Sequence, residues 1–298
     1  MEFLSSANTA LTEADSKLDE RISVLKEKAA ALPVPEPAPD PVVDPVTDPV
    51  IEPAVDPLSL AHQPQAIALN IIHEDEAIIV VNKPAGLVVH PGSGNWDGTM
   101  LNALLQHAPA LANVPRAGIV HRLDKDTSGL LVVAKTLTAQ TDLVRQLQAR
   151  TVRREYAAIV VGIIEREGKV EGPIGRHPIS RTRMAVVARG KPAVTHYEVI
   201  ETFESATLLL CRLETGRTHQ IRVHLTFIGH PLIGDPVYGK RPANRNLPAF
   251  HRQALHAQKL GLVHPVSGKR LSWKAALPAD MCELIERLQS SSIVRAHL

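Results

Sequence analysis

The 298-residue sequence predicts an α+β fold whose single domain spans residues 66–298. Two observations lead to this class. Apolar runs of strand length follow one another between residues 155 and 213 with turns between them and mostly no helix. This order favours an antiparallel or mixed sheet over a doubly wound one. Segments with helical spacing of apolar residues precede and follow these runs, so helices should flank the sheet.

The individual elements follow from the apolar patterns along the chain. The expected strands are Ala77–Val81, Leu130–Ala134, Glu155–Val161, Met184–Ala188, Ala193–Ile200 and Thr207–Leu213. The expected helices are Thr99–His107, Thr138–Ala149, Thr218–Ile228 and Pro278–Gln289. The last helix is the clearest, because its apolar residues recur at i, i+3, i+4 and i+7 from Met281. A turn is expected at Asn82–Pro84, after the first strand.

The N-terminal extension has a different character. Leucines recur every seven residues from Leu11 to Leu32 among helix formers, so residues 1–32 should contain an amphipathic helix over about 10–32. Residues 33–65 are acidic and rich in proline, with an acidic residue before proline every four positions from Asp40-Pro41 to Asp56-Pro57. Because proline disfavours helix at itself and at the preceding residue, we expect a disordered, extended linker here.

Charge separates this extension from the domain behind it. Residues 66–298 carry 29 Lys and Arg against 19 Asp and Glu, whereas residues 33–65 carry six acidic residues and no Lys or Arg. A basic body behind an acidic extension favours a polyanion as partner. The nine aromatic residues argue against modules that stack bases on exposed rings.

Composition also excludes several classes of protein. The two cysteines, Cys211 and Cys282, form neither a disulfide framework nor a C-x-x-C pair. No apolar run approaches the roughly 18 residues that a membrane span needs. Residues 1–10 lack the basic and apolar regions of a secretory signal. We therefore expect a cytoplasmic protein without a membrane partner.

The segment Gly118–Lys135, GIVHRLDKDTSGLLVVAK, concentrates polar chemistry between two apolar runs. His121, Arg122, Asp124, Lys125 and Asp126 fall within six residues. Loops held by a rigid sheet often carry catalytic groups. For any one of these residues alone, the favoured explanation is a charged turn in which an aspartate caps its own backbone. The whole constellation favours a site.

One alternative for this segment is the D-x-D-x-T pattern of phosphotransferases that form an aspartyl phosphate. Asp124-Lys125-Asp126-Thr127 departs from it, because threonine comes one position early. Arg122 also interrupts the apolar run before the motif. The alternation of parallel strands and helices that this fold requires is missing too, so we disfavour this interpretation.

The motif HRLDKDTSGLLVVAK at 121–135 resembles the catalytic segment of the RluA family of pseudouridine synthases, especially the RluD-type members that act on large-subunit ribosomal RNA. Four more blocks in the same order strengthen the resemblance over about residues 70–290. They are NKPAGLVVHPG at 82–92, REYAAIVVG at 154–162, GKPAVTHY at 190–197 and ETGRTHQIRVHLTFIGHPLIGDPVYG at 214–239. No S4-like RNA-binding domain is recognisable in front, which leaves the target RNA open.

The resemblance implies a mixed, largely antiparallel sheet with flanking helices around a central cleft. It implies that Asp124 is the catalytic aspartate, Tyr156 the active-site tyrosine and Arg222 the cation paired with the aspartate. The implied activity is isomerisation of uridine to pseudouridine in structured RNA, most simply 23S ribosomal RNA. A transfer RNA substrate, or a non-catalytic RNA-binding assembly factor on the same domain, remains as an alternative.

These residue types suit that reaction. Uridine isomerisation breaks the N1–C1′ bond, turns the base and rejoins it through C5, so it needs neither a redox cofactor nor a metal. A carboxylate suits a sugar carbon with oxocarbenium character. The guanidinium of Arg222 would stabilise the ionised Asp124 by a charge-assisted pair. Tyr156 could pack on the uracil and help the proton leave C5.

Binding a stacked base requires flipping it into the pocket, which costs a few kcal/mol. Arg122 matches the arginine that enters the RNA stack in a family member, and a guanidinium plane stacks well on bases. The other expected RNA contacts are His121, Lys125, Arg154, Arg183 and Arg217. Lys83-Pro84 and His90–Gly92 should form turns at the cleft rim. We expect the chain to act as a monomer.

Overall fold

The computed structural model describes residues 60–92, 94–239 and 247–296. The helix expected within residues 1–32 and the linker up to residue 59 lie outside these ranges. Residues 60–65 contact the domain, because the Asn102 side-chain amide donates to the carbonyls of Leu60 and Gln63 at 3.2 and 2.8 Å. No helix within the described ranges is long and apolar enough to cross a membrane.

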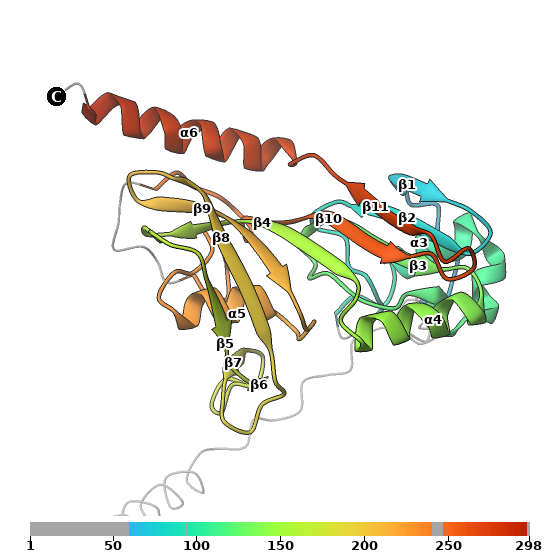
Figure 1. Cartoon of the computed structure of the whole chain (residues 1–298). Helices are drawn as coiled ribbons and strands as arrows, with labels where there is room; N and C mark the ends of the chain where they lie inside the picture. Colours follow the sequence, from blue (N-terminus) through green and yellow to red (C-terminus); the bar gives the residue numbers. More distant parts are fainter. Residues whose placement is uncertain (1–59, 93, 240–246, 297–298) are drawn as a thin grey trace, which may run out of the picture. The chain divides into compact units, whose positions relative to one another are not determined.

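A nine-stranded sheet dominates the described residues (Figure 1), with the strand order β1-β2-β3-β10-β4-β9-β8-β5 and β11 paired to β10. Its strands are β1 (Ile71–Glu74), β2 (Ile78–Lys83), β3 (Ser128–Ala134), β4 (Arg153–Val161), β5 (Gly168–Glu171), β8 (Val194–Thr202), β9 (Ala206–Leu213), β10 (Leu255–Val263) and β11 (Arg270–Lys274). Within this sheet β3 and β10 pair in parallel, and the other neighbouring strands are antiparallel. The predicted α+β class with a mixed, largely antiparallel sheet is confirmed.

Helices cover both faces of the sheet. They are α3 (Met100–His107), α4 (Leu137–Gln148), α5 (Gln220–Phe227) and α6 (Ala279–Ala296), with the 3₁₀ turns η1 (Pro109–Asn113) and η2 (Pro115–Gly118). Strand β2 shows the alternation: Ile79 and Val81 pack with α3 and α5 in one cluster, whereas Ile78 and Val80 pack with α4 in another. Successive strand side chains point to opposite faces, so α3 and α5 share one face. Helix α6 packs with Ile159 of β4 in a third cluster.

A small hairpin of β6 (Ile174–Arg176) and β7 (Met184–Val186) stands apart from the main sheet (Figure 1). Its strands form a separate two-stranded sheet. Met184 and Val186 of the hairpin pack with Val223 of α5, so the hairpin closes over that helix.

The structure corrects several element predictions. The turn expected at Asn82–Pro84 is wrong, because β2 continues through Lys83, which pairs with Gly129 of β3. Helix α6 runs to Ala296, past the expected end at Gln289.

The strands β1, β5, β6, β10 and β11 were not predicted. Strand β10 carries a register shift between Ala257 and Lys259. Such a bulge breaks the period-two alternation by which a strand is recognised in a sequence. The central strand of the fold therefore has a weak sequence signal.

Candidate active site

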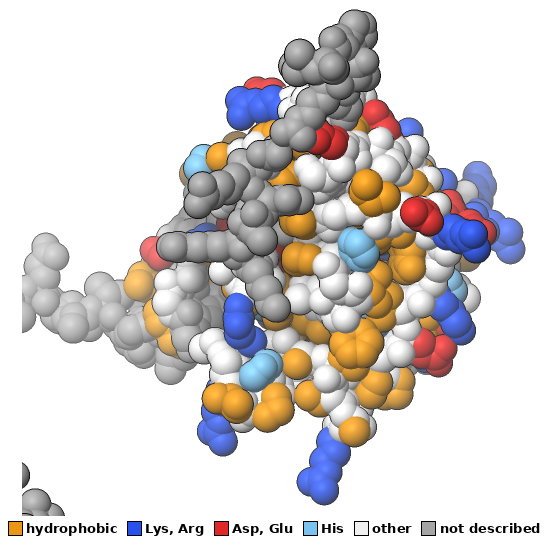
Figure 2. All heavy atoms as spheres, turned by 90° about the vertical axis from the view of Figure 1, so that its left-hand side faces the viewer, with side chains coloured by type: hydrophobic (Ala, Val, Ile, Leu, Met, Phe, Trp, Pro, Cys, Tyr) orange, Lys and Arg blue, Asp and Glu red, His pale blue; other side chains and the backbone are white. Residues whose placement is uncertain are grey.

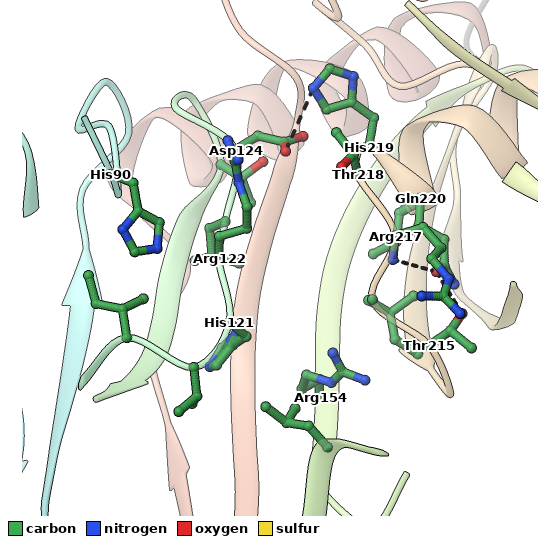
Figure 3. A pocket seen from close by; sticks show the side chains of 18 of the residues that line it. His90, His121, Arg122, Asp124, Arg154, Thr215, Arg217, Thr218, His219 and Gln220 are labelled. Atoms are coloured by element: carbon green, nitrogen blue, oxygen red, sulfur yellow. Dashed lines mark hydrogen bonds and ion pairs between the residues drawn. The ribbon is translucent and has the colours of Figure 1, made fainter. Parts of the chain in front are cut away.

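A cavity of about 1030 Å³ opens on the sheet face that α3 and α5 share. Residues from several parts of the chain line it, among them the loop before β3, strand β4, the end of α4 and the start of α5. The predicted residues that line it are His121, Arg122, Asp124, Arg154, Tyr156, Arg217 and Arg222. Figure 3 shows several of these side chains around the opening. The structure thus brings the three predicted catalytic residues to one cleft.

The Asp124 loop is held in place at the start of β3. Gly129 has a φ of +114°, and a Cβ there would lie 2.3 Å from the carbonyl oxygen of Ala257 in β10. Only glycine permits both this backbone conformation and this approach. The parallel pairing of β3 with β10 begins at this point, with Ser128 opposite His256. The loop that carries Asp124 therefore leaves a fixed strand end.

Lys83 ties a second loop to the Asp124 loop. Its side chain is fully buried, and its ammonium group donates to the carbonyls of Pro84, Leu87 and Lys125 at 2.8 to 2.9 Å. Burial lowers the pKa of Lys83 to about 8, against the opposing charges of Asp126 and Asp124. The side chain is not a surface turn residue at the cleft rim. It is a buried connection between segments 84–87 and 125.

Asp124, Arg222 and Asp235 form the charged centre of the cleft. The Arg222 Nη1 donates to the Asp124 carboxylate at 2.9 Å, so the expected ion pair is present. The same guanidinium donates from Nε and Nη2 to both carboxylate oxygens of Asp235, at 2.7 and 2.9 Å. Arg222 and Asp235 are buried, whereas 18% of the Asp124 side chain is exposed. Asp124 is thus the carboxylate that a substrate can reach.

Electrostatics keep Arg222 and Asp235 charged. Burial alone would lower the pKa of Arg222, but hydrogen bonds and charge from Asp235, with a contribution from Asp124, raise it. Burial alone would raise the pKa of Asp235, but Arg222 and the backbone N–H groups of Tyr238 and Val237 lower it. The Arg222 guanidinium also lies 5.1 Å from the centre of the Tyr238 ring. The cation is therefore fixed before any substrate binds.

Helix α5, which carries Arg222, is anchored by buried polar groups. The Gln220 side chain donates to the carbonyl of Val194 and the hydroxyl of Thr195 on β8, both at 3.0 Å. Its amide oxygen accepts from the Thr215 hydroxyl at 2.7 Å. One turn later, the His224 ring bonds the Thr195 hydroxyl and the Gly172 carbonyl. Buried polar groups with satisfied partners fix an element in one position.

His219 is a neighbour of Asp124 that the sequence did not indicate as a site residue. Its Nε2 lies 3.8 Å from the Asp124 carboxylate, and its Nδ1 lies 2.8 Å from the Tyr238 hydroxyl. His219 adopts a φ of 56°, so α5 begins at Gln220 and not at the expected Thr218. Burial lowers the pKa of His219, and Arg222 adds to this effect against the opposing Asp124 charge.

Tyr156 lies on β4 with only 6% of its surface exposed and lines the cleft. Burial and, to a lesser extent, the charge of Asp124 raise the pKa of Tyr156, against an opposing contribution from Arg154. The phenol is therefore protonated at neutral pH. Its hydroxyl forms no hydrogen bond with another residue of the described part of the chain. The ring packs in the main core cluster.

The predicted RNA contacts have different positions. Arg122 is exposed and lines the cleft. Arg217 also lines the cleft, and its Nε donates to the Pro192 carbonyl. Lys125 is exposed and lies outside the cleft lining. Arg183 also lies outside it, 5.9 Å from the centre of the Tyr238 ring. Figure 2 shows Lys and Arg side chains protruding around the margin of one face.

His121 differs from the other predicted contacts because it is uncharged. Burial lowers the pKa of His121 to about 3, with a contribution from the charge of Arg154. Its Nε2 accepts the backbone N–H of Val132 at 3.2 Å. The neutral ring thus joins the Asp124 loop to β3, and a cationic contact with phosphate from this residue is not expected.

Sequence reasoning missed Asp235, which holds Arg222 in two hydrogen bonds. A signal was present, because Asp235 follows Gly234 and precedes Pro236 in one of the five blocks. An aspartate in such a turn usually caps its own backbone, and Asp235 does accept the N–H groups of Val237 and Tyr238. The pattern gave no indication that its carboxylate also reaches an arginine 13 residues earlier.

Comparison with known proteins gives separate evidence for the family of this chain. The sequence model of the RNA pseudouridylate synthase family matches residues 77–227. A ribosomal large subunit pseudouridine synthase D from Nitrosomonas europaea is 62% identical over 234 residues, covering 77% of this chain and 68% of that protein. The protein of the same name from Escherichia coli strain K12 is 58% identical over 237 residues, covering 76% of this chain and 73% of that protein.

Solved structures of pseudouridylate synthase domains are also similar to this chain. Human RNA pseudouridylate synthase domain containing 1 superposes with a TM-score of 0.58 at 28% identity, covering 72% of this chain and 85% of that one. Human RNA pseudouridylate synthase domain containing 4 gives 0.57 at 26% identity, covering 78% and 95%. The resemblance inferred from the five sequence blocks is confirmed, and the chain belongs to the RNA pseudouridylate synthase family.

Proposed function

We propose that this chain isomerises specific uridines of large-subunit ribosomal RNA to pseudouridine, with Asp124 as the catalytic carboxylate. The observation that carries the proposal is the pair of Asp124 and Arg222, 2.9 Å apart, in a cleft where Arg222 is buried and Asp124 is partly exposed to a substrate. The rRNA substrate is supported by the names of relatives with 58 to 62% identity. No feature of the described residues favours transfer RNA over ribosomal RNA.

The proposed reaction balances without a co-reactant. The N1–C1′ bond breaks, the uracil turns, a C5–C1′ bond forms, the proton leaves C5 and N1 takes up a proton. Asp124 acts at the reacting nucleoside as a carboxylate, which stabilises or captures a sugar carbon that becomes electron-poor. Arg222 orients that carboxylate through a hydrogen bond, and Asp235 holds Arg222. Preorganised charge of this kind needs no rearrangement during the reaction.

Tyr156 is proposed to pack against the uracil. Because burial raises its pKa, the hydroxyl enters the reaction protonated. Its part in removing the C5 proton is then a hydrogen-bonded relay and not that of a free phenolate base. The position of Tyr156 in the lining of the same cleft as Asp124 supports this assignment.

The target uridine must leave its stack to reach Asp124. We propose that Arg122, exposed at the cleft, fills the gap, and that Arg217 and Arg154 contact the RNA from the cleft wall. Lys125 and Arg183 would contact RNA outside the cleft. The proposal includes action as a monomer in the cytoplasm.

The test is to map pseudouridines in total RNA from cells with and without the gene, and to restore the gene as wild type, Asp124→Asn or Asp126→Asn. We expect sites in large-subunit RNA to disappear on deletion and to return with the wild type and Asp126→Asn only. Asp126 is a matched control in the same loop. Unchanged pseudouridines after deletion would contradict the function. Restoration by Asp124→Asn would contradict the role of the carboxylate.

A further inference from the structure

Arg154 is a buried cation that has no ion-pair partner among the described residues. It is 8% exposed, and its Nε is buried without a hydrogen-bond partner. Within the described ranges, no carboxylate forms an ion pair with its guanidinium. By contrast Arg222, which is similarly buried, is paired with Asp124 and Asp235. Arginine remains charged in proteins, and a buried unpaired charge is costly, so such a group is normally matched by an anion.

The guanidinium points into the cleft. Arg154 and Tyr156 are two residues apart on β4, so their side chains lie on the same face of the sheet about 7 Å apart along the strand. Both line the cavity, and Figure 3 shows Arg154 directed into the space bounded by His121 and Thr215. The exposed neighbour Arg153 belongs to the opposite face.

Gly216 makes room for this guanidinium. A Cβ at Gly216 would lie 2.8 Å from the Arg154 Nη1, and Gly216 also lines the cavity. The clash would be with the end of a flexible side chain, so an added methyl group would displace the guanidinium without disturbing the backbone. Gly216 thus leaves space for the Arg154 guanidinium at the cavity.

We propose that Arg154 binds a backbone phosphate next to the flipped uridine and so positions that nucleotide over Asp124. This inference rests on the proposed function and assigns one phosphate subsite within it. A phosphodiester is the anion that RNA brings into the cleft, and a guanidinium binds phosphate oxygens in two hydrogen bonds. The separation of Arg154 and Tyr156 along the strand is similar to the distance between the base and the phosphate of one nucleotide, and the base is proposed to pack on Tyr156.

The first test compares Arg154→Gln with Arg153→Gln, a matched control on the same strand. Steady-state kinetics are measured with a hairpin RNA that contains a mapped target uridine, over a range of salt concentrations. We expect Arg154→Gln to lower kcat/KM about 10- to 100-fold, mainly through KM. The slope of log kcat/KM against log salt should become less steep by about 0.7 to 0.9, the contribution of one phosphate. Arg153→Gln should stay within about twofold of wild type.

The second test identifies the phosphate. A neutral methylphosphonate replaces the phosphate on the 5′ or the 3′ side of the target uridine. One of these substitutions should lower the kcat/KM of the wild type about as much as Arg154→Gln does. It should not lower the kcat/KM of Arg154→Gln further. Gly216→Ala should reproduce part of the defect in the wild type and add nothing to Arg154→Gln.

Two outcomes would overturn the inference. In one, Arg154→Gln lowers activity but keeps the full salt slope, which indicates a structural role. In the other, both methylphosphonates affect Arg154→Gln as strongly as the wild type. In either case the wild type would still form pseudouridine, so the proposed function would stand. If the wild type modified no uridine at all, the proposed function would fail.

Discussion

One guanidinium serves two carboxylates in this cleft: Arg222 donates Nη1 to Asp124 and donates Nε and Nη2 to Asp235. The geometry of the planar fork matters here, because a lysine ammonium is a point charge that cannot reproduce three directed hydrogen bonds. Asp235 is the more demanding partner, since none of its side chain is exposed.

Substitution of Arg222 tests this arrangement. We expect Arg222→Ala to lose far more pseudouridine synthesis than Arg222→Lys, because lysine keeps a positive charge near Asp124 and Asp235. Removing the cation leaves a buried carboxylate unpaired, which destabilises a fold by about 3 to 5 kcal/mol. Thermal unfolding of each variant therefore accompanies the kinetic assay. Equal losses of activity in two folded variants would count against the pairing.

Tyr156→Phe separates the two contributions of the tyrosine. A phenyl ring keeps the packing against the core and the uracil, but it removes the hydroxyl. If the hydroxyl relays the C5 proton, the variant should remake the glycosidic bond and then stall, and an intermediate should accumulate in single-turnover reactions analysed by mass spectrometry. Near-normal turnover would reduce Tyr156 to packing alone.

At the scale of elements, the junction of β3 and β10 positions the catalytic loop. Gly129 meets the Ala257 carbonyl at this junction. We expect Gly129→Ala to destabilise the protein by about 3 kcal/mol in denaturant unfolding, since backbone strain and a backbone clash combine. Gly268→Ala is the control: Gly268 has a φ of +68° but open space around it, so strain alone should cost about 1 kcal/mol. Equal effects would show that the close approach is unimportant.

The same junction contains a buried histidine. His256 is 1% exposed, and its Nδ1 lies 2.9 Å from the Ser128 hydroxyl. Burial lowers the pKa of His256 to about 4 in the folded protein, below the usual 6.5 of an unfolded chain. The unfolded state therefore binds a proton first as pH falls, and the free energy of unfolding should fall between about pH 6.5 and 4. His256→Gln should reduce this pH dependence, measured by denaturant unfolding, and the exposed His251→Gln should not.

The predictability of these elements depended on their surroundings. Strands β2, β3, β4 and β9 have buried apolar runs, and the sequence indicated all four. Strand β10 was missed because its bulge interrupts the alternation. The end of α6 was placed too early because the apolar spacing stops at Leu288, whereas the helix continues through three serines to Ala296.

The charged centre was only partly predictable for a related reason. The block resemblance identified Asp124, Tyr156 and Arg222, and the structure brings all three to one cleft. It could not reveal Asp235, His219 or the burial of Lys83. Those depend on which distant segments meet in space, such as the Lys83 ammonium and the Lys125 carbonyl, 42 residues apart.

For the whole molecule, the excess of basic residues over 66–298 predicts a strong salt dependence of RNA binding. Each neutralised phosphate contributes about −0.7 to −0.9 to the slope of log kcat/KM against log salt. With contacts from several arginines around the cleft, we expect a slope of about −3 or steeper, measured with a ribosomal RNA fragment. A Michaelis constant that does not change with salt would refute a footprint dominated by the RNA backbone.

The central claim is that the Asp124 carboxylate, steadied by Arg222, drives the exchange of an N1–C1′ bond for a C5–C1′ bond. The most direct measurement uses large-subunit RNA made with uridine tritiated at C5, incubated with purified protein. The wild type should release about one tritium to water for every uridine modified, and Asp124→Asn should release none while still binding the RNA. Tritium release by Asp124→Asn at the wild-type rate would contradict the account.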